Sequence, residues 1–287
     1  MRICLASSMA AEDEPPTLEQ IQTLRNEIKE RIGVEGEGML DNRDVDKLMK
    51  EDGYIARFWI HSFFIPGDRV ENAVNLVIDT FKWRKDFGVN DITEDDIDTE
   101  ILDRGSLYYH NRDKKGSKLL VFCIRKHNKD AKKMDLMKKM LIYILERLEK
   151  EEDGKKITII FDSEGAGISN FDLEQVKFLI HVLISYYPNF VEKILVIVMI
   201  LNRFSKLIVL LLHLKVFEMP WILNTAWKII KSILPPPAVA RIKFVTKNNI
   251  KVKIMQTATS KIIGVYSGTD IQRPASCVLG RRGFLGV

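Results

Sequence analysis

Two short apolar runs separated by an amphipathic segment constrain the fold of this chain most strongly. The runs GSKLLVFCIRK (residues 116–126) and KKITIIFD (residues 155–162) are rich in β-branched or aromatic residues, as expected of buried strands. The segment between them, residues 132–154, has the apolar spacing of a helix. A strand, a helix and a strand at this spacing predict two parallel strands joined by a crossover helix. The pattern therefore indicates an α/β fold with a mainly parallel sheet.

The alternation of helix and strand continues after the second run. SNFDLEQVKFLIHVLISYYP (residues 169–188) predicts a helix that begins at a Ser169 or Asn170 cap and ends at Pro188. The motif KILV, which starts at Lys193, predicts the beginning of a further strand.

Helical periodicity dominates the region before the first strand. Thr17 and Gln20 have the spacing of a capping box, and Gly88 is placed to end a helix that follows the turn at Pro66. A second helix is expected within residues 41–64. In the first helix, apolar residues recur at spacings of three and four: Leu18, Ile21, Leu24, Ile28 and Ile32. We predict a polar leader over residues 1–16, too weakly apolar for a secretory signal peptide, and a helical N-terminal lobe over residues 17–104.

The net charge of +5 is concentrated at one end of the chain. The tail from Thr246 onward has seven Lys or Arg residues and a single acid, Asp270, so its net charge is +6. The rest of the chain therefore carries about −1. The body of the protein gives no electrostatic argument for nucleic-acid binding, and we expect no nucleic-acid partner. The three cysteines (Cys4, Cys123 and Cys277) are odd in number and far apart, so they predict neither a disulfide framework nor a metal site. We expect the compartment to be reducing.

Several segments, in order and at consistent spacing, carry a resemblance to a known family. They are EDGYIARFWIHSFFIPGDRVENAVNLVIDTFKWRKDFGVNDI, YHNRDKKGSKLLVF, ITIIFDSEGAGISNFDLEQVKFLIHVLISYYPNF and FEMPWILNTAWKIIKSILPPPAVARIKFV. Over residues 45–250 the chain resembles the CRAL-TRIO lipid-binding proteins. The resemblance implies a helical N-terminal lobe and then a CRAL-TRIO lobe over residues 105–250, with a mainly parallel sheet, crossover helices and a mobile gate helix.

The same resemblance implies a function. It implies non-enzymatic binding or transfer of a phospholipid or other hydrophobic lipid in an apolar pocket at a membrane surface, with no cofactor besides the bound lipid. It further implies a cytoplasmic protein that is peripheral at membranes of the endoplasmic reticulum.

The expected gate helix lies in PWILNTAWKIIKSILPPP, where Pro220 suits a helix start. Asn224, Lys228 and Lys231 share one face, and we expect the two lysines to contact anionic membrane lipid. An ordinary packed helix with a narrow polar stripe is the alternative interpretation of the same pattern. The residues predicted to line the pocket or the gate helix are Phe161, Phe178, Trp221, Ile222, Trp227, Ile230 and Ile233.

The most apolar stretch of the chain interrupts the resemblance. Joining Leu195 to Val216 restores a continuous family-like strand, which predicts that residues 196–215 are an insertion of about twenty residues, compatible with a retained short intron. A transmembrane helix over residues 194–214 is a second interpretation, favouring a membrane-anchored interaction domain, but Arg203 and Lys206 near its centre make insertion marginal. Residues 251–287 depart from the family and are predicted to be a disordered or altered tail.

One acidic motif allows an enzymatic alternative. Asp162 begins FDSEG after a strand, where an Asp nucleophile could serve a metal-dependent phosphotransferase. No accompanying constellation of lysine and acids is evident, so we interpret Asp162 as organising the turn through its backbone, with no catalytic residue and no metal site. His181 is interpreted as helix surface or core edge rather than as a base.

Overall fold

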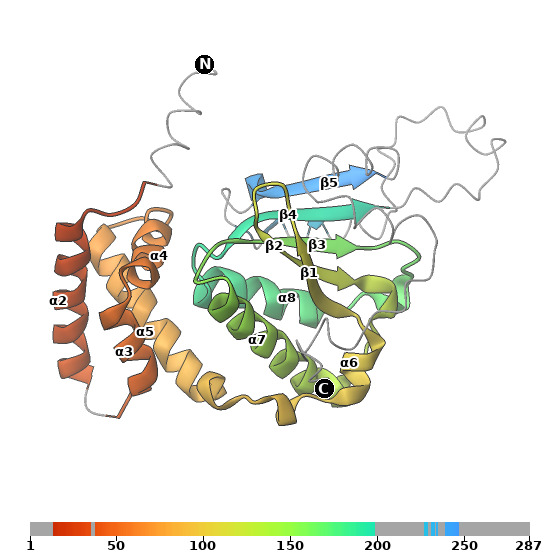
Figure 1. The fold of residues 1–287 in the computed structure, drawn as a ribbon, viewed down its shortest axis with the longest axis horizontal. Helices are drawn as coiled ribbons and strands as arrows, with labels where there is room; N and C mark the ends of the chain where they lie inside the picture. The colour runs from red at the N-terminus through yellow and green to blue at the C-terminus, as the bar shows by residue number, and fades with distance from the viewer. Residues whose placement is uncertain are drawn as a thin grey trace, which may run out of the picture. The chain divides into compact units, whose positions relative to one another are not determined.

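The computed structural model describes residues 14–35, 38–198, 227–228, 231–232, 234 and 239–246 (Figure 1). The chain divides into two compact units. The helical unit comprises residues 1–93, 145–155 and 178–190, and the sheet unit comprises residues 94–144, 156–177 and 191–287, each as far as it is described. The first division falls after Thr93, and two later segments join the helical unit. The predicted boundaries of the lobes stay a prediction.

The helical unit is built from amphipathic helices at the start of the chain. Its elements are α2 (Leu18–Glu35), α3 (Asn42–Lys50), α4 (Asp52–Ser62), α5 (Arg69–Phe87), the short η1 (Val89–Asp91), the second half of α7 (Met134–Glu151), the end of α8 (Leu173–His181) and the π-helical turn η6 (Val182–Tyr186). Buried aromatic residues from α4 and α5 meet at its centre, where the Tyr54 and Phe58 rings contact each other with centroids 5.5 Å apart and Phe81 contacts both. Burial of these rings and of the aliphatic residues around them stabilises the unit.

Local signals in the sequence explain where these helices begin and end. The capping box is confirmed, because Thr17 N donates to Gln20 Oε1 at 2.8 Å and Gln20 N to Thr17 Oγ1 at 3.2 Å. Gly88 ends α5 with φ of 71°, a left-handed conformation that favours glycine. The single helix expected within residues 41–64 is wrong in one respect: Glu51 is extended (φ −108°, ψ 105°) and separates α3 from α4.

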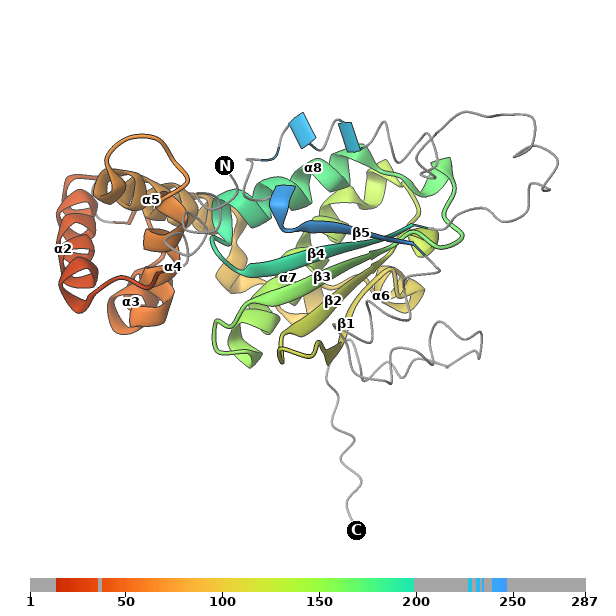
Figure 2. The same ribbon diagram turned by 90° about the horizontal axis from the view of Figure 1, so that it is seen from above.

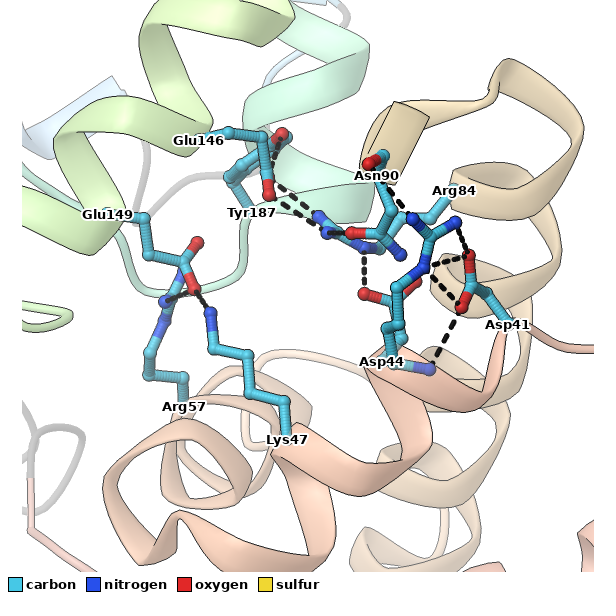
Figure 3. Close-up of polar contacts among 10 residues, drawn as sticks. Asp41, Asp44, Lys47, Arg57, Arg84, Asn90, Glu146, Glu149 and Tyr187 are labelled. Carbon is cyan, nitrogen blue, oxygen red and sulfur yellow. Dashed lines mark hydrogen bonds and ion pairs between the residues drawn. The ribbon is translucent and has the colours of Figure 1, made fainter. Parts of the chain in front are cut away.

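Buried ion pairs join the segments of the helical unit that lie far apart in sequence (Figure 3). Arg84 on α5 donates to Asp44 on α3 at 2.9 Å and to Glu146 on α7 at 2.7 Å. Glu146 Oε1 also accepts the hydroxyl of Tyr187 at 2.6 Å. Because Arg84 and Asp44 are 3% and 2% exposed, removing the charge of Arg84 would leave Asp44 buried without its ion-pair partner. Arg84 without Asp44 would still pair with Glu146.

A second buried pair lies beside the first. Glu149 on α7 is 4% exposed and contacts Lys47 Nζ at 2.5 Å and Arg57 Nη1 at 3.3 Å. Arg57 Nε also donates to the carbonyl of Pro188 at 3.0 Å. The pairs around Arg84 and Glu149 thus hold α3, α4 and α5 to the later segments that complete this unit.

The sheet unit carries the predicted strand and helix alternation. Its elements are η2 (Glu94–Asp96), α6 (Thr99–Arg104), β1 (Leu107–Arg112), β2 (Lys118–Cys123), η3 (Ile124–Lys126), η4 (Ala131–Lys133), the first half of α7, β3 (Ile157–Asp162), η5 (Ile168–Asn170), the first half of α8, β4 (Val191–Val198) and β5 (Ile242–Thr246). The expected cap at Ser169 or Asn170 is corrected: Asp172 Oδ1 accepts Glu174 N at 3.0 Å and caps α8, while the Asn170 amide donates to the carbonyl of His127.

The strands of the described residues form one sheet in the order β1-β2-β3-β4-β5 (Figures 1 and 2). β1 pairs antiparallel with β2, and all other pairings are parallel. The mixed α/β fold with a mainly parallel sheet is therefore confirmed.

Strand β4 continues past the predicted start of the insertion. Val196, Ile197 and Val198 pair with β5, and Ile197 is buried, so the strand is not interrupted at Leu195. Residues 199–215 lie outside the described residues, as do residues 251–287, and the insertion and the altered tail stay predictions. No helix within the described parts of the chain is both long and apolar enough to cross a membrane.

Candidate functional site

Four apolar side chains form a row across strands β2 to β5. Phe122 pairs with Phe161, Phe161 with Val196, and Val196 with Phe244. Paired residues on neighbouring strands project from the same face of a sheet, so these side chains share one face. All four are half-buried, which leaves apolar surface for a ligand. We call this row the apolar platform.

Two aromatic contacts hold the side chains of the platform, one between β2 and β3 and one at β5. The Phe122 and Phe161 rings stack with their centroids 4.9 Å apart and their planes at 24°. Near the other edge, the ring of Phe244 meets that of Trp227 at 4.9 Å and 81°, an edge-to-face contact. Trp227 is half-buried. One residue of the predicted gate helix therefore lies against the platform.

A second apolar row on the same face adjoins the platform. Leu120 pairs with Ile159, Ile159 with Ile194, and Ile194 with Ile242. Leu120 and Ile159 are fully buried, whereas Ile194 and Ile242 are half-buried. Only Ile194 and Ile242 of this row keep apolar area from which hydrocarbon could exclude water.

A charged group lies on the opposite face of the sheet. Lys193 Nζ is 2.6 Å from Asp113 Oδ2, which also accepts the hydroxyl of Thr158 at 3.1 Å. Burial raises the pKa of Asp113, but the bonds from Lys193, Thr158 and the Ser117 amide outweigh it and leave the pKa lowered. Because Thr158 and Lys193 stand three residues from Phe161 and Val196, strand alternation places these polar groups away from the platform.

Asp162 organises the turn after β3, as interpreted from the sequence. Its Oδ1 accepts the amide of Glu164 at 3.0 Å, and the following Ser163 donates from N and from Oγ to the carbonyl of Ile197. Asp162 is buried on the face opposite Phe161. Among the residues that the structure describes, no group of three His, Cys, Asp or Glu side chains could hold a metal ion.

A buried histidine and carboxylate lie near the carboxyl ends of β2 and β3. His127 Nε2 is 3.8 Å from Asp172 Oδ2, beyond hydrogen-bond distance. Burial lowers the pKa of His127, and the charge of Asp172 opposes this shift. The neutral imidazole is therefore favoured near neutral pH.

The structure brings only some of the predicted site residues together. Phe161 and Trp227 both lie at the platform, whereas Phe178 belongs to the helical unit, where its ring stacks on Phe87 with centroids 6.2 Å apart. Lys228 and Lys231 are exposed, and their membrane contact stays a prediction. The remaining predicted residues lie outside the described residues: Trp221, Ile222, Ile230 and Ile233. His181 is confirmed as helix surface, since it is exposed and its Nε2 lies 3.1 Å from the Tyr186 hydroxyl.

Three platform residues were missed from the sequence: Phe122, Val196 and Phe244. The signal for two of them is present in LLVFC and IKFV, where a phenylalanine occupies the same alternating position as its apolar neighbours two residues away. What the sequence lacks is the register, which alone shows that these positions fall level with Phe161.

Part of the sheet unit is similar to a known family. Residues 102–199 match the family model described as the CRAL/TRIO domain, a segment that includes Phe122, Phe161 and Val196. This match supports the resemblance to the CRAL-TRIO family over residues 102–199.

Two similar proteins add detail to the comparison. A CRAL-TRIO domain-containing protein of Schizosaccharomyces pombe is 24% identical over 189 residues, which cover 62% of this chain and 38% of that protein. The crystal structure of Sfh5 is 15% identical with a TM-score of 0.43, covering 65% of this chain and 62% of that one. The chain thus spans less than two thirds of the length of either protein.

Proposed function

We propose that the sheet unit binds a hydrophobic lipid against the apolar platform and transfers it at a membrane surface. The observation that carries the proposal is the half-buried row formed by Phe122, Phe161, Val196 and Phe244. The first three of these residues lie in the segment that matches the CRAL/TRIO family model. The ligand class is phospholipid or another lipid with an acyl chain, because the platform offers apolar area and ring faces. No cofactor and no catalytic residue is part of the proposal.

The remaining predicted residues complete the proposal. Trp221, Ile222, Trp227, Ile230 and Ile233 would form a mobile gate over the lipid, and Lys228 and Lys231 would face the membrane. Phe178 is retained as a candidate pocket residue on the same terms. Within the family, residues 45–250 resemble the CRAL-TRIO region of motile sperm domain-containing protein 2, and we include in the proposal that likeness and peripheral association with the cytoplasmic face of the endoplasmic reticulum.

Native mass spectrometry of the full chain purified from cells tests the proposal. A bound lipid should appear as a defined added mass. Phe161→Asp should remove it, because a charge on the platform would have to be desolvated beside hydrocarbon. Val34→Asp places the same charge at an apolar residue of the helical unit that is 79% exposed, so it should keep the lipid and serves as the matched control. Chain without any added mass, or an added mass unaffected by Phe161→Asp in a folded variant, contradicts the proposal.

Lipid transfer between vesicles separates this function from a phosphotransferase. Asp162→Asn keeps an Oδ1 acceptor for the amide of Glu164, so the turn should persist while a nucleophilic carboxylate is lost. We expect transfer to survive this substitution and the addition of a chelator. Loss of transfer in both cases, with the variant still folded, would favour the metal-dependent enzyme.

A further inference from the structure

The loop between α4 and α5 presents large apolar side chains to solvent. Phe63 is 44% exposed and Ile65 37% exposed, and Phe64 between them is half-buried. The Phe63 and Phe64 rings contact each other edge to face, with centroids 5.7 Å apart. Pro66 and Gly67, which complete the loop, are also exposed. We call residues 63–67 the apolar loop.

Hydrogen bonds hold the apolar loop in one conformation. The amide of Phe64 donates to the carbonyl of His61, and that of Ile65 to Ser62, both at 3.1 Å. Asn72 Nδ2, from the first turn of α5, donates to the carbonyls of Ile65 at 3.0 Å and Pro66 at 3.3 Å. The loop is therefore preorganised, and binding through it would cost little conformational entropy.

A cation stands at the base of the apolar loop. The guanidinium of Arg69 lies 4.5 Å from the Trp59 ring centroid and 5.5 Å from that of Phe63. Its Nε and Nη2 donate to the carbonyl of Trp59 at 3.3 and 3.2 Å. Burial lowers the pKa of Arg69, and the charge of the Glu14 carboxylate opposes this shift. An arginine held in this way can offer its remaining N–H groups to a phosphate.

From this arrangement we infer that the apolar loop inserts into the headgroup region of a phospholipid bilayer, with Arg69 at the level of the phosphates. A bilayer is apolar inside and bears phosphate groups at its surface. The apolar loop has aromatic and aliphatic side chains that suit the apolar layer, and Arg69 at its base suits the phosphate layer. The inference rests on the proposed function only in that a lipid carrier must reach membranes, and it adds a membrane contact outside the predicted gate helix.

Acidic residues near the apolar loop limit the electrostatic part of membrane binding. The exposed Asp68 and Glu71 lie beside Arg69, and Asp68 Oδ1 accepts the amide of Glu71 at 2.9 Å to cap α5. This end of the unit is therefore not a basic patch, and attraction to anionic lipid cannot dominate. Insertion of apolar side chains would supply most of the binding, which should then depend little on salt.

Cosedimentation of the full chain with phosphatidylcholine vesicles tests the inference. Replacing Phe63 and Ile65 with Ser should weaken vesicle binding roughly tenfold or more, because two apolar side chains no longer enter the membrane. The matched control replaces Val34 and Met39 with Ser; they are exposed apolar residues of the same unit outside the loop, 79% and 45% exposed. The control should bind as the parent chain does, and parent binding should persist at about 0.5 M salt.

Native mass spectrometry of the loop variant separates this inference from the proposed function. The double Ser variant should retain its bound lipid while losing vesicle binding, and Arg69→Gln should weaken binding by a smaller factor. Unchanged vesicle binding in the double Ser variant, an equal loss in the control, or loss of parent binding in salt would each overturn the inference. A chain that carries no lipid but binds vesicles through the loop would uphold it and contradict the proposed function.

Discussion

Phe122 and Phe161 stack with ring centroids 4.9 Å apart on two parallel strands that pair them directly. The rings are half-buried, so they contribute both to packing and to the surface offered to a ligand. The stack is the central contact of the apolar platform.

Phe122→Ala should remove most of the bound lipid while the protein stays folded with a moderately lower free energy of unfolding. A fully buried phenylalanine typically costs about 3–5 kcal/mol on truncation, so a half-buried ring should cost roughly half of that. Urea unfolding would measure the free energy of unfolding, and native mass spectrometry the occupied fraction. Phe122→Leu is the matched control and should retain most of the bound lipid. Full occupancy in a stable Phe122→Ala variant would exclude this ring from the site.

Sequence patterns predicted the elements of the sheet better than the pairs between them. The strands at residues 118–123 and 157–162 and the helix between them follow from local periodicity. β1 was not expected, because YHNRDKKGSKLL lacks a clear apolar alternation and its hairpin partner supplies the pairing. Phe178 shows the same limit: helical spacing marks it as apolar, but only the tertiary fold shows that its ring stacks on Phe87.

Long-range ion pairs could not be predicted in the same way. Lys47 and Glu149 are 102 residues apart, and each looks like an ordinary exposed charge on an amphipathic helix. Their pairing depends on two helices meeting in space, which no local pattern encodes. For Ile197 the local pattern was misleading. The apolar run that contains this residue was interpreted as an insertion, but β4 includes Ile197, which pairs with Asp162 of β3.

Glu149 should make stability depend on pH in the acid range. Burial opposes its ionisation, but Arg57 and Lys47 outweigh burial and lower the pKa from 4.5 to about 2. A carboxyl with a lowered pKa in the folded state stabilises the fold above its unfolded pKa, and this stability is lost as pH falls toward the folded pKa. The free energy of unfolding should therefore decrease between these two values.

Glu149→Gln isolates this contribution. The variant leaves Lys47 and Arg57 without their carboxylate, so it should lose about 3–5 kcal/mol near neutral pH and show a flatter acid dependence. Urea titrations at a series of pH values, with Glu151→Gln as a control at a more exposed glutamate of the same helix, measure both effects. An acid dependence that is identical in the parent and in Glu149→Gln would assign it to other groups.

Lys193 and Asp113 should prove strongly coupled. Lys193→Met leaves the fully buried Asp113 carboxylate with Thr158 as its remaining side-chain donor, which should cost roughly 3 kcal/mol or more. Combining Lys193→Met with Asp113→Asn removes the unpaired charge and should restore part of this loss. A double-mutant cycle in urea measures the coupling energy. Additive losses would show that the pair contributes little beyond its separate contacts.

Deleting residues 196–215 tests whether this apolar segment is foreign to the domain. In the shortened chain Val216 would follow Leu195, which keeps a valine at the platform position of Val196 and places Phe217 at the buried position of Ile197. A larger side chain at that position costs about 1–3 kcal/mol if the site cannot adjust. Against this cost, the deletion removes an apolar run that promotes aggregation and a loop whose closure costs a few kcal/mol at most. We therefore expect higher solubility, a higher melting temperature and stronger lipid binding.

Replacing residues 199–215 with a Gly and Ser linker of equal length is the matched control for that deletion. The linker keeps β4 through Val198 and removes the apolar side chains of the run together with its few polar and charged ones, such as Arg203 and Lys206. If apolar surface is the main liability, the linker variant should gain solubility as the deletion does, but gain less in melting temperature because the long loop remains. Sequencing of transcripts would show whether a form without the segment exists. A lower melting temperature in the deletion, with every transcript carrying residues 196–215, would establish the segment as an integral part of the fold that continues β4 beyond Leu195.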